Sequence, residues 1–300
     1  MAEPGRVVIT GASRGLGLAS AAHLYRQGWS VVAAVRSPGV ALERLREATG
    51  ARPDHRRLVA VELDLDDPAS IERAAGEIVA GGAPDALVHN AGIAGVGSVE
   101  EMPPEIWAGI FSTNLFGPMR LTQQLLPAMR AAGRGRIVVV SSQGGVRGMP
   151  GISAYSAAKG ALERWAEALS PEIAPFGLGV TVLVTGMFRT DILEKTEHHA
   201  DFDGPYAGLH TALDTNGRRF LRFARAPEDF AAALARALQH RGPFSRVAVG
   251  LDARLAVLGS RMLPSRLFQF LVVRALGLPR PGTLHDVPDP SIRSEAPTRG

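Results

Sequence analysis

The stretch RVVITGASRGLG, residues 6–17, decides the fold. Its first five residues, Arg6–Thr10, are mostly β-branched, which is typical of a buried strand. Glycines at positions 11, 15 and 17 follow directly and lead into a helical pattern over Leu16–Gln27. A glycine-rich turn between a strand and a helix lets a phosphate approach the backbone N–H groups of the helix N-terminus. This turn therefore predicts a nucleotide site, although similar turns also occur for packing alone.

Short apolar runs alternate with helical patterns from this stretch as far as residue 250. The further predicted strands are Ser30–Val35, Leu58–Glu62, Asp85–His89, Arg136–Ser142, Val180–Val184 and Ser245–Gly250. The further predicted helices are Ala41–Ala48, Pro68–Ala80, Glu105–Ala131, Ala154–Ala174 and Pro227–His240. Several strands are apolar on both faces, as buried parallel strands require. We therefore predict one α/β domain over residues 5–250, a Rossmann-type doubly wound parallel sheet with helices on both faces.

Three regions lie outside this alternation. Residues 187–226 form a longer, irregular connection, which predicts a substrate lid. Its apolar side chains predict an apolar substrate, and they are Leu193, Phe202, Tyr206, Leu209 and Leu213. Residues 251–278 have apolar residues at helical spacing and are split at Pro264, which predicts two short amphipathic helices. Residues 279–300 contain five prolines and are predicted to be a flexible tail.

The amphipathic stretch 251–278 has two interpretations. We favour a role as core cover or as a wall of the substrate cleft. Its arginines at positions 254, 261, 266 and 274 leave contact with a membrane surface as the less favoured alternative.

Composition and charge exclude several classes of protein. Of 300 residues, 46% are hydrophobic and 21% are charged, as in a folded globular chain rather than a disordered one. The absence of cysteine excludes disulfides, thiolate metal sites and a cysteine nucleophile. The net charge of +4 comes from dispersed arginines without interleaved aromatics, so we expect no nucleic-acid partner. His198 and His199 lack further ligands, so no metal is expected, and the lack of a signal peptide or membrane-spanning run predicts a cytoplasmic protein.

The end of the second predicted strand bears on the choice of nucleotide. NAD sites usually place an acid there for the ribose 2′-hydroxyl, whereas an arginine accommodates a 2′-phosphate. Arg36 follows this strand directly, and Arg14 in the glycine turn is a second cation. We therefore predict NADP as the cofactor, the alternative being that Arg36 is simply a solvated surface arginine.

A tyrosine and a lysine on one predicted helix carry the chemical signal. Tyr155 and Lys159 are four residues apart, which places both side chains on the same helix face. Lys159 is one of only two lysines in the chain. An ammonium near a phenol lowers the phenol pKa from its usual value near 10, which favours acid/base work at neutral pH. Ser142 ends a predicted strand, where ligands bind in open α/β sheets.

These features belong to a longer series of motifs along the chain. The series is Thr10–Gly17, His89-Asn90-Ala91-Gly92, Asn114, Ser141-Ser142, and Tyr155 with Lys159. In order and spacing it resembles the short-chain dehydrogenase/reductase family over about residues 5–250. The resemblance implies a sheet of about seven strands, NADP(H)-dependent hydride transfer between an alcohol and its ketone or aldehyde, and a homo-oligomer. The extension beyond residue 250 resembles members that act on lipophilic alcohols or ketones, such as steroid- or retinol-type dehydrogenases.

The resemblance also implies roles for individual residues. Tyr155 would be the catalytic acid/base, Ser142 would hydrogen-bond the reacting oxygen, and Lys159 would bind the nicotinamide ribose and lower the Tyr155 pKa. Asn114, within the long predicted helix, would anchor a water that relays protons from Lys159. The implied cofactor-binding residues are Gly11, Ser13, Arg14, Gly15, Leu16, Gly17, Arg36, Asp64, Leu65, Asn90, Ala91, Gly92, Tyr155, Lys159, Gly186, Met187, Phe188 and Thr190. Among them, Asp64 would contact the adenine, and the four residues from 186 to 190 would hold the carboxamide and the diphosphate.

Two positions depart from the family pattern. His89 stands where the family usually has an asparagine, and Thr185 stands where it commonly has a proline. Neither change removes a catalytic group. The alternatives are a reductase of 3-oxoacyl thioesters and a non-catalytic NADP-binding sensor or scaffold, and the intact Ser142, Tyr155 and Lys159 argue against the latter.

Overall fold

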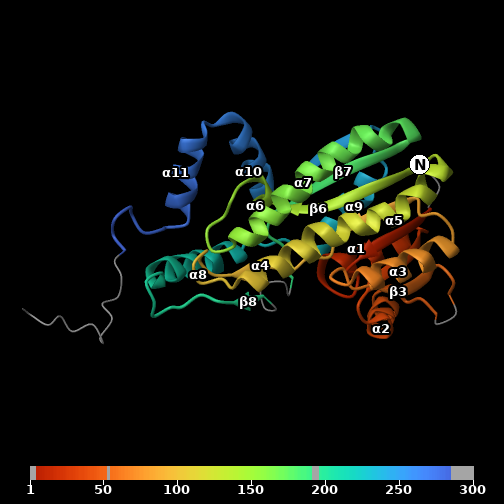
Figure 1. The fold of residues 1–300 in the computed structure, drawn as a ribbon, viewed down its shortest axis with the longest axis horizontal. Helices are drawn as coiled ribbons and strands as arrows, with labels where there is room; N and C mark the ends of the chain where they lie inside the picture. The colour runs from red at the N-terminus through yellow and green to blue at the C-terminus, as the bar shows by residue number, and fades with distance from the viewer. Residues whose placement is uncertain (1–4, 53–54, 191–195, 285–300) are drawn as a thin grey trace, which may run out of the picture.

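The computed structural model describes residues 5–52, 55–190 and 196–284 (Figure 1). Within these ranges seven parallel strands form one sheet in the spatial order β3-β2-β1-β4-β6-β7-β9. The strands are β1 (Arg6–Thr10), β2 (Ser30–Val35), β3 (Leu58–Glu62), β4 (Ala86–His89), β6 (Gly135–Ser142), β7 (Leu178–Thr185) and β9 (Phe244–Val249). The strand order reverses between β1 and β4, so a crevice for ligands is expected at their carboxyl ends. The predicted doubly wound α/β sheet is confirmed.

Helices cover both faces of the sheet and build two hydrophobic cores. One face carries α3 (Pro68–Ala80), α5 (Gly117–Ala132) and α7 (Ser153–Ile173), and the other carries α1 (Gly15–Arg26), α2 (Pro38–Thr49) and α9 (Pro227–Leu238). Leu125 and Leu162 are buried on the first face, and Leu45 and Phe230 on the second. The strands between them are buried on both sides, which explains why the sequence runs are apolar throughout.

The helix predicted over Glu105–Ala131 is confirmed in its extent, because helical residues run without a break from Pro104 to Ala132, but it is not a regular α-helix throughout. The structure has α4 (Pro104–Phe111), a π-helical turn η1 (Ser112–Phe116), and then α5. The physical reason is Pro118, which has no N–H with which to bond the carbonyl of Asn114 in a regular α-helix. The N–H of Gly117 instead bonds the carbonyl of Ser112, five residues back. Asn114 therefore lies in an irregular turn, where its carbonyl lacks the usual helical donor.

The predicted lid contains a helix and a short strand. Helix α8 (Ala207–Leu221) is its longest described element, and β8 (Glu197–His198) pairs in parallel with β5 (Gly95–Val96). Two of its expected apolar wall residues, Phe202 and Tyr206, instead pack around His210, with ring centroids 5.7 and 6.4 Å away. The expected wall residue Leu193 lies outside the described residues.

The C-terminal extension forms the two predicted helices, α10 (Leu251–Met262) and α11 (Ser265–Ala275), separated at Pro264. They stand as an arch away from the sheet in Figure 1. The favoured interpretation as core cover does not describe α11, because none of its residues is buried. Two short helical segments complete the elements named here, α6 (Gln143–Val146) and η2 (Ala174–Phe176). Among the described helices, none has the length and hydropathy of a membrane span, and residues 285–300 of the predicted tail lie outside the described residues.

Candidate active site

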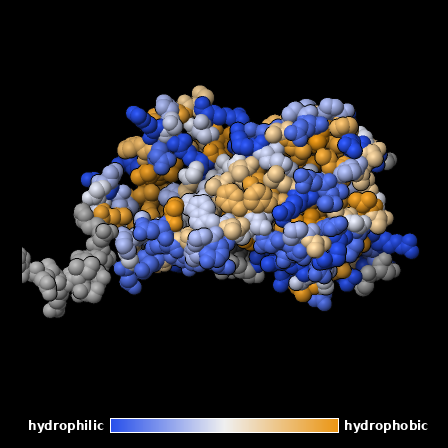
Figure 2. Space-filling view, viewed as in Figure 1, coloured by the Kyte–Doolittle hydropathy of each residue, from blue (hydrophilic) through white to orange (hydrophobic). Residues whose placement is uncertain are grey.

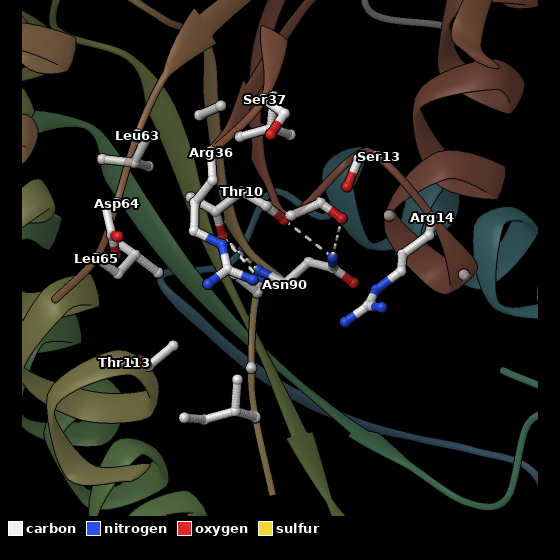
Figure 3. A pocket seen from close by; sticks show the side chains of 18 of the residues that line it. Thr10, Ser13, Arg14, Arg36, Ser37, Leu63, Asp64, Leu65, Asn90 and Thr113 are labelled. Carbon is white, nitrogen blue, oxygen red and sulfur yellow. Dashed lines mark hydrogen bonds between the residues drawn. The ribbon is translucent and has the colours of Figure 1, made fainter. Parts of the chain in front are cut away.

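A cleft of about 420 Å³ opens at the carboxyl ends of β1, β2 and β4 (Figure 3). It gathers residues that are far apart in the sequence but were predicted together. Those predicted residues are Gly11, Ser13, Arg14, Gly15, Leu16, Gly17, Arg36, Asp64, Leu65, Asn90, Ala91, Gly92 and Thr190. Tyr155, Lys159, Gly186, Met187 and Phe188 do not line this part of the crevice. Their role toward a cofactor, like that of the cleft residues, stays a prediction.

The glycine turn needs glycine for its backbone conformation and for close packing. Gly11 and Gly15 adopt left-handed φ values of 67° and 52°, which disfavour any residue with a Cβ. A Cβ on Gly17 would lie 2.3 Å from the carbonyl oxygen of Gly11 and 2.6 Å from Nδ2 of Asn90. The turn therefore packs against itself and Asn90, and only glycine fits at its centre.

The turn is also tied to the end of β4. The backbone N–H groups of Asn90 and Ala91 both donate to the Thr10 hydroxyl, each at 3.0 Å. The Asn90 side chain donates to the carbonyl of Thr10 at 2.9 Å. Figure 3 shows these bonds on the floor of the cleft. Asn90 thus fixes the geometry of the turn from the neighbouring strand.

The cleft offers positive charge and an open helix N-terminus. The guanidinium groups of Arg14 and Arg36 point into it (Figure 3). Within the described residues, no ion pair engages either group, and no side chain caps the N-terminus of α1. The carboxylate of Asp64 accepts a hydrogen bond from the N–H of Asp66 at 3.0 Å. These features fit a phosphate-bearing nucleotide, because free N–H groups and arginines are the usual partners of phosphate oxygens.

The predicted catalytic side chains meet at the carboxyl end of β6. Ser142 ends this strand, and its hydroxyl is close enough to the Tyr155 phenol to lower the pKa of that group. The Ser142 oxygen also accepts from the N–H of Gly144 at 3.2 Å, which holds the side chain in place. Lys159 Nζ lies 5.8 Å from the centre of the Tyr155 ring and donates to the Val140 carbonyl at 2.9 Å. The three side chains therefore form one group beside the crevice.

The pKa of Tyr155 corrects one prediction. Burial raises this pKa, and the nearby Ser142 hydroxyl only partly opposes the rise. The net direction is therefore opposite to the predicted one, because burial outweighs any lowering of the pKa by the Lys159 ammonium. Burial likewise lowers the pKa of Lys159 to about 8, against the opposing effect of the Glu163 carboxylate. At neutral pH the pair accordingly consists of a protonated phenol beside an ammonium.

Gly92 lines the cleft and also lies beside Asn114 and Lys159 of the catalytic group. A Cβ on Gly92 would lie 3.2 Å from Oδ1 of Asn114 and 3.4 Å from Nζ of Lys159. Both polar atoms of the Asn114 side chain are hydrogen-bonded to the backbone of Ile93, which donates to Oδ1 at 2.9 Å and accepts from Nδ2 at 2.8 Å. The backbone carbonyl of Asn114, which Pro118 leaves without its regular i+4 donor, is a further acceptor for a water.

A buried acid behind Lys159 was not predicted. Glu163 is one helical turn further along α7 and only 1% exposed. It accepts from the Ser141 hydroxyl at 2.6 Å and is paired with Arg246 of β9. The spacing of four residues between Lys159 and Glu163 could have predicted that they share a helix face. The contact of Glu163 with Arg246 spans 83 residues, and nothing in the local sequence indicates it.

His89, which stands where the family usually has an asparagine, is a neutral imidazole in this structure. It is 1% exposed, and Nε2 lies 2.8 Å from the hydroxyl of Thr122. Burial, helped by the charge of Lys159, lowers the pKa of His89 to about 3. His89 thus acts as an uncharged hydrogen-bonding group in the core beneath the site.

The loop after β7 is held by the C-terminal extension. The N–H of Met187 donates to Oδ2 of Asp252 in α10 at 2.7 Å, and a Cβ on Gly186 would collide with the same carboxylate. Phe188 packs its side chain edge-on against Phe230 at 5.8 Å, so only its backbone can face a ligand. Asp252 lies 65 residues from Met187, and nothing in the local sequence pointed to this contact.

The comparisons with known proteins agree with this geometry. Residues 6–201 match the family described as short chain dehydrogenase. The chain belongs to this family. Within it, the uncharacterized oxidoreductase YbbO of Escherichia coli (strain K12) is 34% identical over 262 residues, covering 87% of this chain and 91% of that protein.

Solved structures extend the likeness. A short-chain dehydrogenase from Streptomyces avermitilis has 34% sequence identity and a TM-score of 0.76, covering 92% of this chain and 98% of that one. A metagenomic short-chain oxidoreductase in complex with NADP has 25% identity and a TM-score of 0.64, covering 82% of this chain and 96% of that one. The chain is therefore an oxidoreductase of the short-chain dehydrogenase family. No group of three or more histidine, aspartate or glutamate side chains suited to a metal occurs in the described part of the chain.

Proposed function

We propose that this oxidoreductase uses NADP(H) to interconvert an apolar alcohol and its ketone or aldehyde. The observation that carries the proposal is the grouping of Ser142, Tyr155 and Lys159 at the carboxyl end of β6, next to a glycine-lined cleft. A steroid- or retinol-type substrate, a cytoplasmic location and a homo-oligomer stay predictions.

The choice of NADP rests on the charge of the cleft. Arg36 follows β2, where an acid would favour the ribose 2′-hydroxyl of NAD and an arginine favours a 2′-phosphate. Arg14 adds a second cation on the glycine turn. The similar metagenomic oxidoreductase, which was solved with NADP, supports the same choice.

The protein side of the reaction follows from the pKa directions. The nicotinamide supplies or accepts the hydride when it is bound. Because burial keeps Tyr155 protonated at neutral pH, its hydroxyl is ready to donate a proton to a carbonyl oxygen. Ser142 shares that oxygen as a hydrogen-bond donor and stabilises the charge that develops on it. The ammonium of Lys159 favours the phenolate that remains.

An apolar substrate is supported by the side of the lid that reaches the site. Leu213 of α8 lies against Gly151, where a Cβ would be 2.6 Å from its methyl group. Gly151 precedes Tyr155 by four residues, at the start of the catalytic helix α7. Leu209, one turn before Leu213, is likewise half-buried. The lid therefore places the apolar side chain of Leu213 against the segment next to Tyr155.

The test is oxidation of NADPH and NADH against a panel of apolar ketones, aldehydes and 3-oxoacyl thioesters. We expect turnover with NADPH on an apolar ketone or aldehyde. Tyr155→Phe is expected to lower kcat by about 10³-fold or more while leaving the Kd for NADPH nearly unchanged. Tyr25→Phe, which removes a phenol far from the site, is the matched control.

Three outcomes would contradict the proposal. Full activity of the Tyr155→Phe variant would remove the acid/base role. Turnover of 3-oxoacyl thioesters alone would favour the thioester reductase. Tight NADPH binding without turnover on the whole panel would favour a sensor or scaffold.

A further inference from the structure

Helix α10 carries an apolar stripe that faces away from the core. Leu251, Leu255, Leu258 and Met262 are 70%, 59%, 56% and 73% exposed. Their spacing of four, three and four residues places them on one helix face. The opposite face holds Ala253, which is fully buried. The stripe is thus one continuous apolar face of the helix rather than a set of scattered surface residues.

Helix α11 has an exposed apolar face of its own. Leu267, Phe270 and Leu271 are 44%, 59% and 44% exposed and share one face by their spacing. The arch is nevertheless fixed to the body, because Arg147 donates to the carbonyl of Ser265 at 2.6 Å and lies 4.6 Å from the ring of Phe268. Figure 2 shows the orange and blue side chains intermixed on this part of the surface. The two helices therefore present an ordered apolar surface.

The charge of the same segment is strongly one-sided. Between residues 251 and 284 the acid is Asp252, and its carboxylate is engaged by the N–H of Met187. The cations, all exposed, are Arg254, Arg261, Arg266, Arg274 and Arg280. No ion pair involves these arginines within the described part of the chain. The segment thus combines exposed leucines with unpaired arginines.

We propose that the α10–α11 arch binds the surface of an anionic lipid membrane. Leucines at the acyl boundary with arginines at the headgroups are the arrangement by which interfacial helices bind such surfaces. A second copy of the arch is a poor partner, because pairing would bring eight arginines together without counter-charges. Pro264 breaks the helix between the two faces, so each half can lie along the surface.

This binding is separate from the proposed activity. Arg254 precedes Leu255 and Arg261 precedes Met262, so both arginines follow one edge of the stripe. The lipid contact therefore needs no residue of the crevice. A short-chain dehydrogenase so placed would meet lipophilic substrates where they are dissolved.

The experiment is flotation of the full chain with vesicles of phosphatidylcholine, either alone or with about one third phosphatidylglycerol. We expect binding to the anionic vesicles, and at least about tenfold weaker binding to the neutral ones or at high salt. Leu255→Glu with Leu258→Glu, and separately Arg254→Gln with Arg261→Gln, are each expected to weaken binding at least about tenfold. Val99→Glu, at an exposed apolar position elsewhere, and Arg236→Gln with Arg241→Gln are the matched controls.

Folding of every variant is checked by thermal unfolding and by its Kd for NADPH. The proposal would be overturned if wild-type binding did not depend on lipid charge, or if the control variants lost as much vesicle binding as the test variants. So would a wild-type chain that stays off anionic vesicles. If that chain instead self-associates with rising concentration, and the double glutamate variant does not, the surface pairs two copies.

Discussion

The glycine turn and the C-terminal arch have opposite kinds of structural constraint. In the first, a Cβ on Gly17 would strike a backbone oxygen at 2.3 Å, whereas in the second a Cβ on Gly259 would meet the ring of Phe268 at 2.7 Å. Helix α1 buries six of its twelve residues, but α10 and α11 together bury only Ala253. Backbone contacts cannot yield, while a side chain can turn aside. The turn is therefore specified residue by residue, and the arch only by its pattern.

The largest contrast is expected in stability. Phe230 in α9 is fully buried, whereas Phe270 in α11 is 59% exposed. Phe230→Ala is expected to lower the free energy of unfolding by about 3–5 kcal/mol, and Phe270→Ala by less than about 0.5 kcal/mol. Urea denaturation of both variants measures this. Similar losses would mean that the arch belongs to the folded core.

Gly17 in the glycine turn and Gly259 in the arch allow a direct comparison of the two regions. Gly17→Ala is expected to weaken NADPH binding by at least about tenfold and to destabilise the protein by about 1–3 kcal/mol, because the Gly11 carbonyl cannot move away. Gly259→Ala is expected to be nearly neutral, since helix propensity gained by alanine offsets the shift of the Phe268 ring. Fluorescence titration and thermal unfolding give both quantities. An unaltered Kd for NADPH in Gly17→Ala would refute the role of the turn.

Asp252 connects the two regions and gives the next effect. Asp252→Ala leaves the N–H of Met187 without its acceptor, which is expected to cost about 1–2 kcal/mol in stability and to raise the Kd for NADPH. Asp252→Asn keeps an acceptor oxygen and is expected to behave nearly as the wild type. Asp214→Ala, which removes an exposed carboxylate paired with Arg218, is the control. If Asp252→Ala and Asp214→Ala behave identically, Asp252 does not stabilise the loop after β7.

The last effect concerns His89 and depends on pH. Unfolded histidine takes up a proton near pH 6.5, but His89 in the fold does so only near pH 3. Between these values the unfolded state binds more protons, so the free energy of unfolding decreases as the pH is lowered, by at most about 1.4 kcal/mol per pH unit. His89→Asn is expected to remove this contribution in denaturation curves at pH 7, 6 and 5, while His240→Asn is the surface control. The same slope in wild type and His89→Asn would contradict the assignment.

Local sequence rules predicted the parts of the molecule that local contacts determine. The strands β1, β2 and β3 have the predicted bounds, because a buried parallel strand must be apolar on both faces. The cleft gathers most of the predicted cofactor-binding residues, because strand ends and helix starts of one sheet edge converge. The two arch helices were likewise predicted from their spacing, together with the break at Pro264.

Long-range contacts and burial account for what was missed. The π-helical turn at Asn114 depends on a proline four residues later, and the Glu163–Arg246 and Met187–Asp252 contacts join distant segments. The Tyr155 pKa was predicted in the wrong direction, because spacing shows that Lys159 is near but not how deeply the phenol is buried. The exposure of the arch could not be read from a pattern that core helices share.

The central claim is that the cleft is built for NADP(H), and its most direct measurement is the Kd of NADPH and of NADH in wild type and Arg36→Asp. We predict that the wild type binds NADPH more tightly and that Arg36→Asp shifts the ratio of the two constants by about 10²-fold toward NADH. Arg120→Asp, on the exposed surface of α5, should leave the ratio unchanged. An unchanged ratio in Arg36→Asp would contradict the claim.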